Sequence, residues 1–285
     1  MNETISTIVW LLLLIGYSML LLAYARFWRR RAGDVYYRAA MQSPYEQDKI
    51  NNAMRSILAG NKDAARLYAI MLADRFSSRH PGKAFCLKGI VCVFSSYYYP
   101  KRFDEYLQPE QLQDIQDVLD FKDGKIPGTD FFQTGLNCLE PKPGTIVLFM
   151  PCSSEYKYKT RFKGISEYID SHCPNLINGF DYLEFTRERA SLHLTKGRTK
   201  NKIPKNYNLT MNLRGKEIII VDDLLTSGTS LADFKEQIGR KGGKVTGAIF
   251  AAQTFKMPLL IVIRIHALIN YCMQKKKMID TVFPS

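Results

Sequence analysis

The feature that most constrains this chain is an uncharged apolar run near its start, residues 5–25. A helix needs roughly 20 apolar residues to cross the hydrocarbon core of a bilayer, and this run has that length. Trp10 lies near one end of the run, and Phe27 and Trp28 follow the other end, as in the aromatic belts of membrane spans. The run therefore predicts a membrane-spanning helix.

Positive charge flanks this run on one side. Arg26 and the arginines at positions 29–31 follow it, whereas Glu3 is the single charged side chain before it. The positive-inside rule then places the C-terminal bulk of the protein in the cytoplasm. A cleaved signal peptide would carry its positive charges ahead of the apolar run, so we interpret residues 1–31 as an uncleaved, single-pass anchor.

Residues 32–97 are predicted to form a helical linker or insert. Apolar residues recur at helical spacing on both sides of Gly60 and Asn61, which predicts two helices between residues 47 and 76. The apolar and aromatic stretch at residues 85–99 fits a buried helix or a strand, and its periodicity does not decide between them.

A Gly- and Pro-rich stretch, residues 124–144, is predicted to be a loop. After it, short apolar runs alternate with amphipathic segments, which is typical of an α/β fold with a parallel sheet. We assign this domain to residues 98–255. The predicted strands are residues 145–150, 180–185, 217–221 and 245–252, and the predicted helices are residues 112–119, 161–171 and 231–240.

The C-terminal tail, residues 256–285, is apolar and then basic. Arg264 and His266 interrupt its apolar part and argue against a second membrane span. We expect an ordinary core helix or strand there. The alternative is an interfacial segment that places the lysines at positions 275–277 among anionic headgroups.

The strongest chemical signal is at residues 218–230, where an apolar strand is followed by Asp222 and Asp223, a small hydroxylated loop and a helix. In open α/β sheets, ligands bind beyond the carboxyl ends of strands, and the N–H groups at a helix N-terminus bind anions. Gly228 lets the backbone approach a phosphate closely. The two carboxylates suit the diol of a ribose and, directly or through water, a Mg²⁺ ion. The hydroxyl donors of the loop are Thr226, Ser227, Thr229 and Ser230.

This ordered pattern resembles the signature of type I phosphoribosyltransferases, enzymes that bind 5-phosphoribosyl-1-pyrophosphate (PRPP). The resemblance implies a Rossmann-like, parallel-sheet domain that uses Mg²⁺. It also implies that Asp222 and Asp223 hold the ribose hydroxyls and that residues 226–230 hold the 5-phosphate. The chain is most similar to the ComF-like branch of that family, although the N-terminal cysteine cluster of that branch is missing.

Two further segments take part in the resemblance. Residues 151–163 follow the first core strand and correspond to the pyrophosphate loop, with Cys152, Ser153 and Ser154 as PRPP-binding residues. Residues 187–201 are similar to the arginine-rich stretch that covers the active site as a flexible loop. The resemblance implies catalytic roles for Arg187 and Arg189 and PRPP binding by Arg198.

These features favour a membrane-anchored, cytoplasmic-facing, Mg²⁺-dependent phosphoribosyltransferase that transfers the phosphoribosyl group to an unidentified base or amine and releases pyrophosphate. A second hypothesis is a non-catalytic sensor of PRPP or of a nucleotide, and a homodimer is a further expectation. A third hypothesis is a ComF-like role in DNA uptake or handling. It draws on the formal net charge of +13 and on Tyr156, Tyr158 and Phe162 as stacking platforms for bases. The six cysteines form no CxxC pair, which argues against a structural zinc site.

Overall fold

The structure of the protein is a computed structural model that describes residues 2–186 and 206–282. The chain divides into two compact units. The first combines residues 1–76, 105–107 and 256–285, and the second combines residues 77–104 and 108–255. The predicted start of the α/β domain, residue 98, is the last residue of a sheet strand, so that sheet also includes residues ahead of it.

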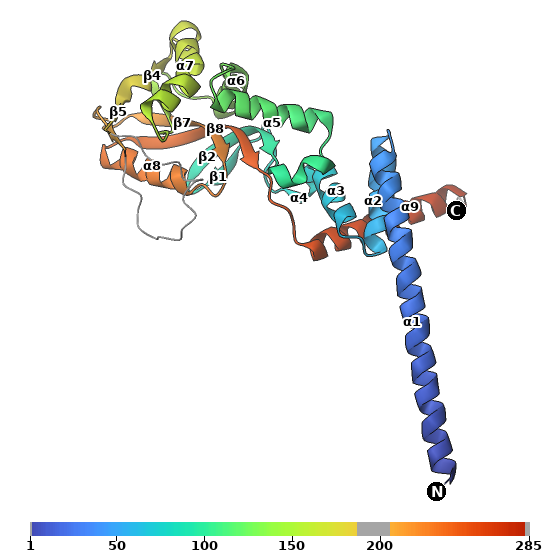
Figure 1. The fold of residues 1–285 in the computed structure, drawn as a ribbon. Helices are drawn as coiled ribbons and strands as arrows, with labels where there is room; N and C mark the ends of the chain where they lie inside the picture. The colour runs from blue at the N-terminus through green and yellow to red at the C-terminus, as the bar shows by residue number, and fades with distance from the viewer. Residues whose placement is uncertain (1, 187–205, 283–285) are drawn as a thin grey trace. The chain divides into compact units, whose positions relative to one another are not determined.

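The first unit is helical, and its longest element is α1 (Asn2–Gln42) (Figure 1). Among the described residues, α1 is the single helix that is long and apolar enough to cross a membrane, with a mean hydropathy of 1.7. None of its most apolar window is buried inside the protein, unlike the core helix of a globular domain. The expected membrane helix is therefore present in length and composition, and it continues without a break into a segment that packs on the next helix.

The two predicted helices of this unit are confirmed as α2 (Glu46–Leu58) and α3 (Asp63–Met71), and a short α4 (Ala73–Phe76) follows them. Gly60 separates α2 from α3 with a φ of +105°, a conformation that favours glycine. The side chain of Asn61 then accepts hydrogen bonds from the N–H groups of Asp63 and Ala64, at 2.9 and 3.0 Å, and so caps α3.

The C-terminal tail forms one helix, α9 (Leu260–Val282). Ile263 and Ala267 are buried and form the side of α9 that packs on α2 and α3. The phenol of Tyr68 lies 3.1 Å from Nδ1 of His266 and accepts a hydrogen bond of 2.8 Å from Asn270, which ties α9 to α3. The expectation of a core element is therefore met by one side of α9, whereas apolar residues on its other side are exposed.

The second unit contains a mixed, mostly parallel sheet with the strand order β1-β2-β8-β7-β3-β4, in which β1 alone is antiparallel to its neighbour. This confirms an α/β fold, and it resolves residues 85–99 as two strands. The strands are β1 (Phe85–Leu87), β2 (Ile90–Tyr98), β3 (Thr145–Phe149), β4 (Leu176–Asn178), β7 (Glu217–Leu225) and β8 (Lys244–Thr254). A separate antiparallel pair is formed by β5 (Leu183–Phe185) and β6 (Tyr207–Leu209).

Helices cover both faces of the sheet (Figure 1). Three of them lie on one face, namely α5 (Pro109–Lys122), α6 (Thr129–Leu139) and α7 (Glu155–His172). On the other face lies α8 (Thr229–Arg240), which buries the predicted apolar side made by Leu231, Phe234 and Ile238. Because the sheet is covered on both faces, the interior strand β3, which lies between β7 and β4, is buried along its whole length. Two short 3₁₀ helices, η1 (Lys101–Tyr106) and η2 (Phe180–Tyr182), complete the connections.

The prediction of a loop at residues 124–144 was wrong, because α6 occupies the middle of this stretch. Gly135 lies on α6, and a Cβ built there would come within 2.4 Å of Ile249 on β8. This glycine therefore permits close packing of helix on sheet and does not mark a loop. The prediction of a strand at residues 180–185 was half right, since η2 precedes the three residues of β5.

Candidate functional site

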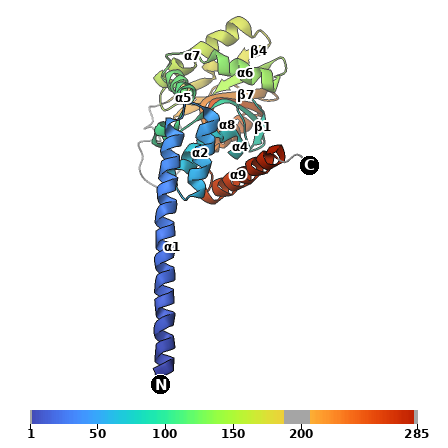
Figure 2. The same cartoon turned by 90° about the vertical axis from the view of Figure 1, so that its right-hand side faces the viewer.

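The candidate site lies where the chain leaves the sheet in two opposite directions. Strands β3 and β7 pair in parallel, with Phe149 opposite Val221. After β3 the chain passes through α7 to β4 on one side, and after β7 it passes through α8 to β8 on the other side (Figures 1 and 2). Such a topological switch point leaves a crevice at the carboxyl ends of the strands, which is where α/β proteins bind ligands.

Asp222 and Asp223 lie at this switch point. The prediction that the strand ends at Val221 was wrong, because β7 continues through both acids to Leu225 by pairing with β8. The pairing of β3 with β7 ends at Val221, so the two acids extend beyond the end of β3. The N–H group of Asp223 donates to Asp222 Oδ1 at 2.9 Å, and the N–H group of Leu224 donates to Asp223 Oδ1 at 2.9 Å.

Arg161, a cation of the predicted pyrophosphate loop at residues 151–163, joins this site from α7. Its Nη1 lies 3.1 Å from Oδ2 of Asp223, and the two side chains are only 11% and 12% exposed. Its Nε donates to the carbonyl oxygen of Lys122, at the end of α5, at 3.4 Å. The sequence itself indicates that Arg161 faces inward. It lies three residues after Tyr158 and four before Ile165, so helical periodicity places it near the buried side of α7.

The electrostatics of the two acids differ. Burial and the neighbouring Asp223 carboxylate raise the pKa of Asp222 well above its usual range, and the positive charge of Arg161 offsets this in part. Burial disfavours the charged form of Arg161, but the Asp223 carboxylate together with Cys152, Asp222 and Asp123 more than offsets that effect, so the pKa of Arg161 is raised. Asp223 is therefore engaged in an ion pair, while Asp222 is poised to hold a proton.

The loop after β7 presents hydroxyl groups at the start of α8. Gly228 precedes the first helical residue with a φ of +76°, and a Cβ there would lie 2.7 Å from the side chain of Leu87. Thr226 and Ser227 are exposed, and Ser227 Oγ lies 2.9 Å from Thr229 Oγ1. Ser230 is also exposed, in the first turn of α8. The predicted phosphate-binding residues are thus brought together at a helix N-terminus, which attracts anions.

The loop after β3 is shorter than predicted. The proposed pyrophosphate loop at residues 151–163 was wrong beyond Ser154, because α7 begins at Glu155 and Ser154 Oγ caps it by accepting from the N–H group of Lys157 at 3.3 Å. Cys152 is buried within the short loop, and this burial raises the pKa of its thiol to about 12. The cysteine is therefore a packing residue, whereas Ser153 and Ser154 are half-buried.

The lysines predicted in that loop lie on the first turns of α7 instead. Lys159 pairs with Glu155 at 2.7 Å, and Lys163 pairs with Glu167 at 3.7 Å, both along the helix. Tyr158 and Phe162 are buried in the core, so the prediction that they stack nucleic-acid bases was wrong. Of these three aromatic residues, Tyr156, which is 76% exposed, is the one that a base could still stack on.

Asn206 contributes to this site, although it was not among the predicted site residues. Its side chain is fully buried, and Nδ2 donates to the carbonyl oxygens of Cys152 and Ser153 at 3.1 Å each. Its Oδ1 is buried without a hydrogen-bond partner in the part of the chain that the structure describes. Asn206 thus fixes the β3–α7 loop through hydrogen bonds to its backbone. The predicted active-site residues Arg187, Arg189 and Arg198 lie outside the described residues.

Comparisons with known proteins add no name to this site. No protein-family model matches the chain, and a search of curated proteins found no match. Within the described residues, no group of three or more His, Cys, Asp or Glu side chains is arranged to hold a metal ion.

Proposed function

We propose that this protein binds PRPP in the crevice between β3 and β7 and transfers its phosphoribosyl group to a base or amine. One observation carries the proposal: two adjacent acids and a hydroxylated loop at a helix N-terminus meet at the switch point of a parallel sheet. Type I phosphoribosyltransferases, which residues 218–230 resemble, are expected to have this arrangement.

The parts of PRPP match separate parts of the crevice. The ribose diol would lie against Asp222 and Asp223, and the 5-phosphate against the N–H groups and hydroxyls of residues 226–230. The pyrophosphate would lie toward Ser153 and Ser154 in the β3–α7 loop. Departure of pyrophosphate from C1 leaves positive charge on the ribose and negative charge on the leaving group, so cationic groups near the leaving group would speed the reaction. The resemblance assigns that task to Arg187 and Arg189.

The residues present fit Mg²⁺ that enters with PRPP. Mg²⁺ prefers oxygen ligands, retains several waters, and is usually held by one or two carboxylates together with substrate phosphates. Asp222 and Asp223 supply two carboxylates, and the described residues hold no larger cluster that would trap the ion alone. When bound, the ion would neutralise charge on the pyrophosphate.

A non-catalytic PRPP sensor is the second candidate, and the ion pair between Arg161 and Asp223 favours it. The acid that would hold a ribose hydroxyl also holds Arg161 of α7, at 3.1 Å. Such a contact would make the site respond to ligand through α7 without requiring turnover.

Calorimetric titration of the full-length protein in detergent with PRPP and Mg²⁺ tests binding. Asp222→Asn together with Asp223→Asn should abolish the signal, whereas Asp117→Asn, an exposed acid on α5, should leave it unchanged. Absence of PRPP binding by the unaltered protein would refute both candidates. Pyrophosphate release with a panel of purines, pyrimidines and amines separates enzyme from sensor.

The orientation in the membrane is a further part of the proposal. The arginines that follow the apolar part of α1 favour placing the folded units in the cytoplasm. Protease added to sealed inside-out vesicles should digest both units and spare only residues near the N-terminus. Digestion in right-side-out vesicles instead would refute this orientation.

A further inference from the structure

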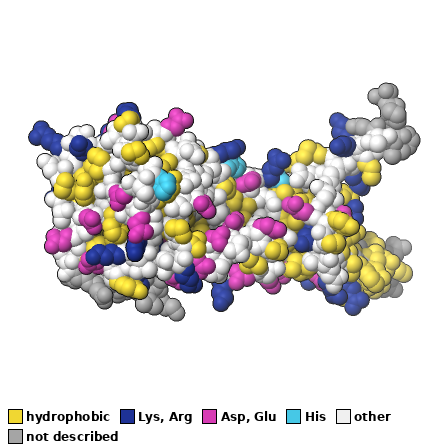
Figure 3. Space-filling model, turned by 90° about the horizontal axis from the view of Figure 1, so that it is seen from above, with side chains coloured by type: hydrophobic (Ala, Val, Ile, Leu, Met, Phe, Trp, Pro, Cys, Tyr) yellow, Lys and Arg dark blue, Asp and Glu magenta, His cyan; other side chains and the backbone are white. Residues whose placement is uncertain are grey.

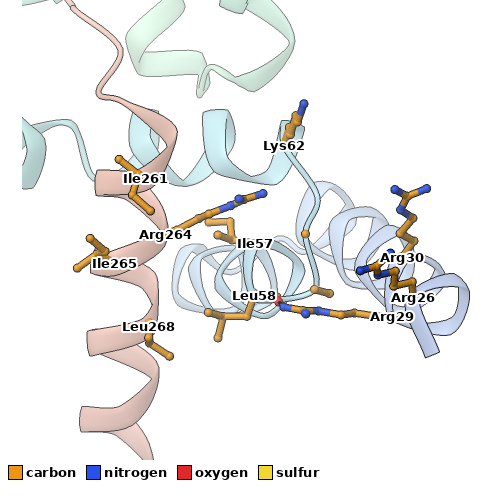
Figure 4. Close-up of a pocket in the computed structure, with 12 residues that line it drawn as sticks. Arg26, Arg29, Arg30, Ile57, Leu58, Lys62, Ile261, Arg264, Ile265 and Leu268 are labelled. Atoms are coloured by element: carbon orange, nitrogen blue, oxygen red, sulfur yellow. Dashed lines mark hydrogen bonds between the residues drawn. The ribbon is translucent and has the colours of Figure 1, made fainter. Parts of the chain in front are cut away.

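A hollow of about 580 Å³ lies in the first unit between α1, the end of α2 and α9 (Figure 4). Cationic side chains line this hollow on all sides, and its lining includes no Asp or Glu. The cations are Arg26, Arg29, Arg30, Lys62 and Arg264. Such a concentration of one charge favours an anionic ligand.

These cations lack anionic partners. In the described part of the chain none of the five forms a salt bridge, and Arg29 donates a hydrogen bond to the carbonyl oxygen of Leu58 at the end of α2. The Nε of Arg264 is buried and has no hydrogen-bond partner among the described residues. Leaving such a donor unsatisfied destabilises a folded protein, and an anion in the hollow would satisfy it.

The rest of the wall is apolar. Ile57 and Leu58 come from α2, and Ile261, Ile265 and Leu268 come from α9 (Figure 4). The three residues of α9 are 50–59% exposed, an unusual state for large aliphatic side chains on neighbouring turns of one helix. An anion that enters this hollow therefore meets hydrocarbon beside positive charge, which suits an amphiphile better than an inorganic ion.

The position of the hollow matches the surface of a bilayer. Arg26, Arg29 and Arg30 follow directly after the apolar stretch of α1, and hydrophobic side chains gather over α1 (Figure 3). α9 crosses the direction of α1 beside this arginine-rich part (Figures 1 and 2). A helix that lies in the membrane plane buries its apolar residues at the level of the headgroups, and arginines at that level meet lipid phosphates.

We propose that this hollow binds an anionic glycerophospholipid. The phosphate lies among Arg26, Arg30 and Arg264, and the acyl chains follow the exposed apolar residues of α9 into the bilayer. The inference rests on α1 crossing a membrane and is independent of PRPP binding. Its consequence is that α9, packed on α2 and α3, lies on the membrane surface as a second attachment of the first unit.

Native mass spectrometry of the full-length protein, released from nanodiscs of equal parts phosphatidylglycerol and phosphatidylcholine, tests this proposal. We expect retained phosphatidylglycerol to exceed phosphatidylcholine. Because each cation near a lipid surface contributes about 1 kcal/mol, Arg26→Gln with Arg30→Gln should weaken this preference about tenfold or more. Both side chains are exposed. Arg264→Met should weaken it further, with the melting temperature in detergent as the check on folding.

The matched control is Lys275→Gln with Lys276→Gln, which removes the same charge from exposed positions outside the hollow. If binding is local, this control should weaken the preference clearly less than Arg26→Gln with Arg30→Gln does, because the two lysines add only the diffuse attraction of a charged surface. Equal losses in the two double variants would mean diffuse attraction and would overturn the site. The proposal is equally overturned if the unaltered protein shows no preference, if inorganic phosphate displaces the lipid, or if alkaline carbonate extracts the chain from membranes.

Discussion

Arg161→Met removes the cation that holds Asp223 and gives the clearest test of how the candidate site is built. Methionine fills much of the space of the arginine stem, so the change removes charge more than volume. Asp223 would remain buried beside Asp222 without a salt-bridge partner among the described residues. The carbonyl oxygen of Lys122 would also lose the donor that links α5 to α7.

The geometry sets the size of the effect. Opposite charges 3.1 Å apart attract each other by about 5 kcal/mol at an effective dielectric constant of 20. Removing one partner of a buried pair costs roughly 3–5 kcal/mol, because the remaining charge stays desolvated. Since each side chain retains about a tenth of its exposure, we expect the lower end, a loss of about 3 kcal/mol in the free energy of unfolding.

Urea unfolding of the full-length protein in detergent, followed by near-ultraviolet circular dichroism, measures this loss. A double-mutant cycle with Asp223→Asn isolates the pair, because the double variant leaves no unpaired charge behind. We expect the double variant to be more stable than Arg161→Met alone. Lys159→Met, which breaks an exposed pair on the same helix, should leave the unfolding curve unchanged. A loss below about 1 kcal/mol for Arg161→Met, or additive effects in the cycle, would refute a buried and coupled pair.

Three other predictions address single residues. Burial and Asp223 raise the pKa of Asp222, so its contribution to stability is complete below its unfolded pKa, roughly 3.9, and is lost as pH rises through the folded pKa. Asp222→Asn should therefore make the free energy of unfolding fall less steeply as the pH rises toward neutral. Urea unfolding at several pH values measures this, and an unchanged dependence on pH contradicts the prediction. Gly228→Ala should lose about 1–2 kcal/mol of stability because of its positive φ, and a neutral effect in thermal melts would show that the loop relaxes. Cys152 should react with iodoacetamide far more slowly than exposed Cys86, and equal rates by mass spectrometry would contradict its burial.

The sequence predicts the local parts of this protein well. The strand, acids, loop and helix at residues 217–240 are consecutive, so their order alone places them together at one strand end. Alternation of apolar runs with amphipathic segments predicts the α/β class for the same reason. The break between α2 and α3 is also local, because Gly60 and Asn61 supply the positive φ and the cap themselves.

Contacts between residues that are distant in the chain could not be predicted, because they depend on tertiary packing. Arg161 and Asp223 are far apart in the chain, and helical periodicity, which places this arginine near the buried side of α7, does not identify its partner. The ion pair forms because α7 turns Arg161 toward the end of β7, while Lys159 and Lys163 pair along the helix surface. Gly135 illustrates the same limit, since its proximity to Ile249 exists only after the helix packs on the sheet. Asn206 is a polar residue in a polar stretch until the β3–α7 loop closes over it.

The arrangement gives the two acids different tasks. A carboxylate can accept about four hydrogen bonds. Asp223 uses one oxygen for Arg161 and the other for the N–H group of Leu224. The hydroxyls of a ribose can therefore add to these contacts without breaking them. Asp222, whose raised pKa favours the protonated form, is expected to ionise when a metal ion binds against it. Ligand binding should therefore release a proton from Asp222, and the heat of binding should change with the ionisation enthalpy of the buffer. In the Asp222→Asn variant the heat of binding should no longer depend on the buffer. If it still does, the released proton comes from another group.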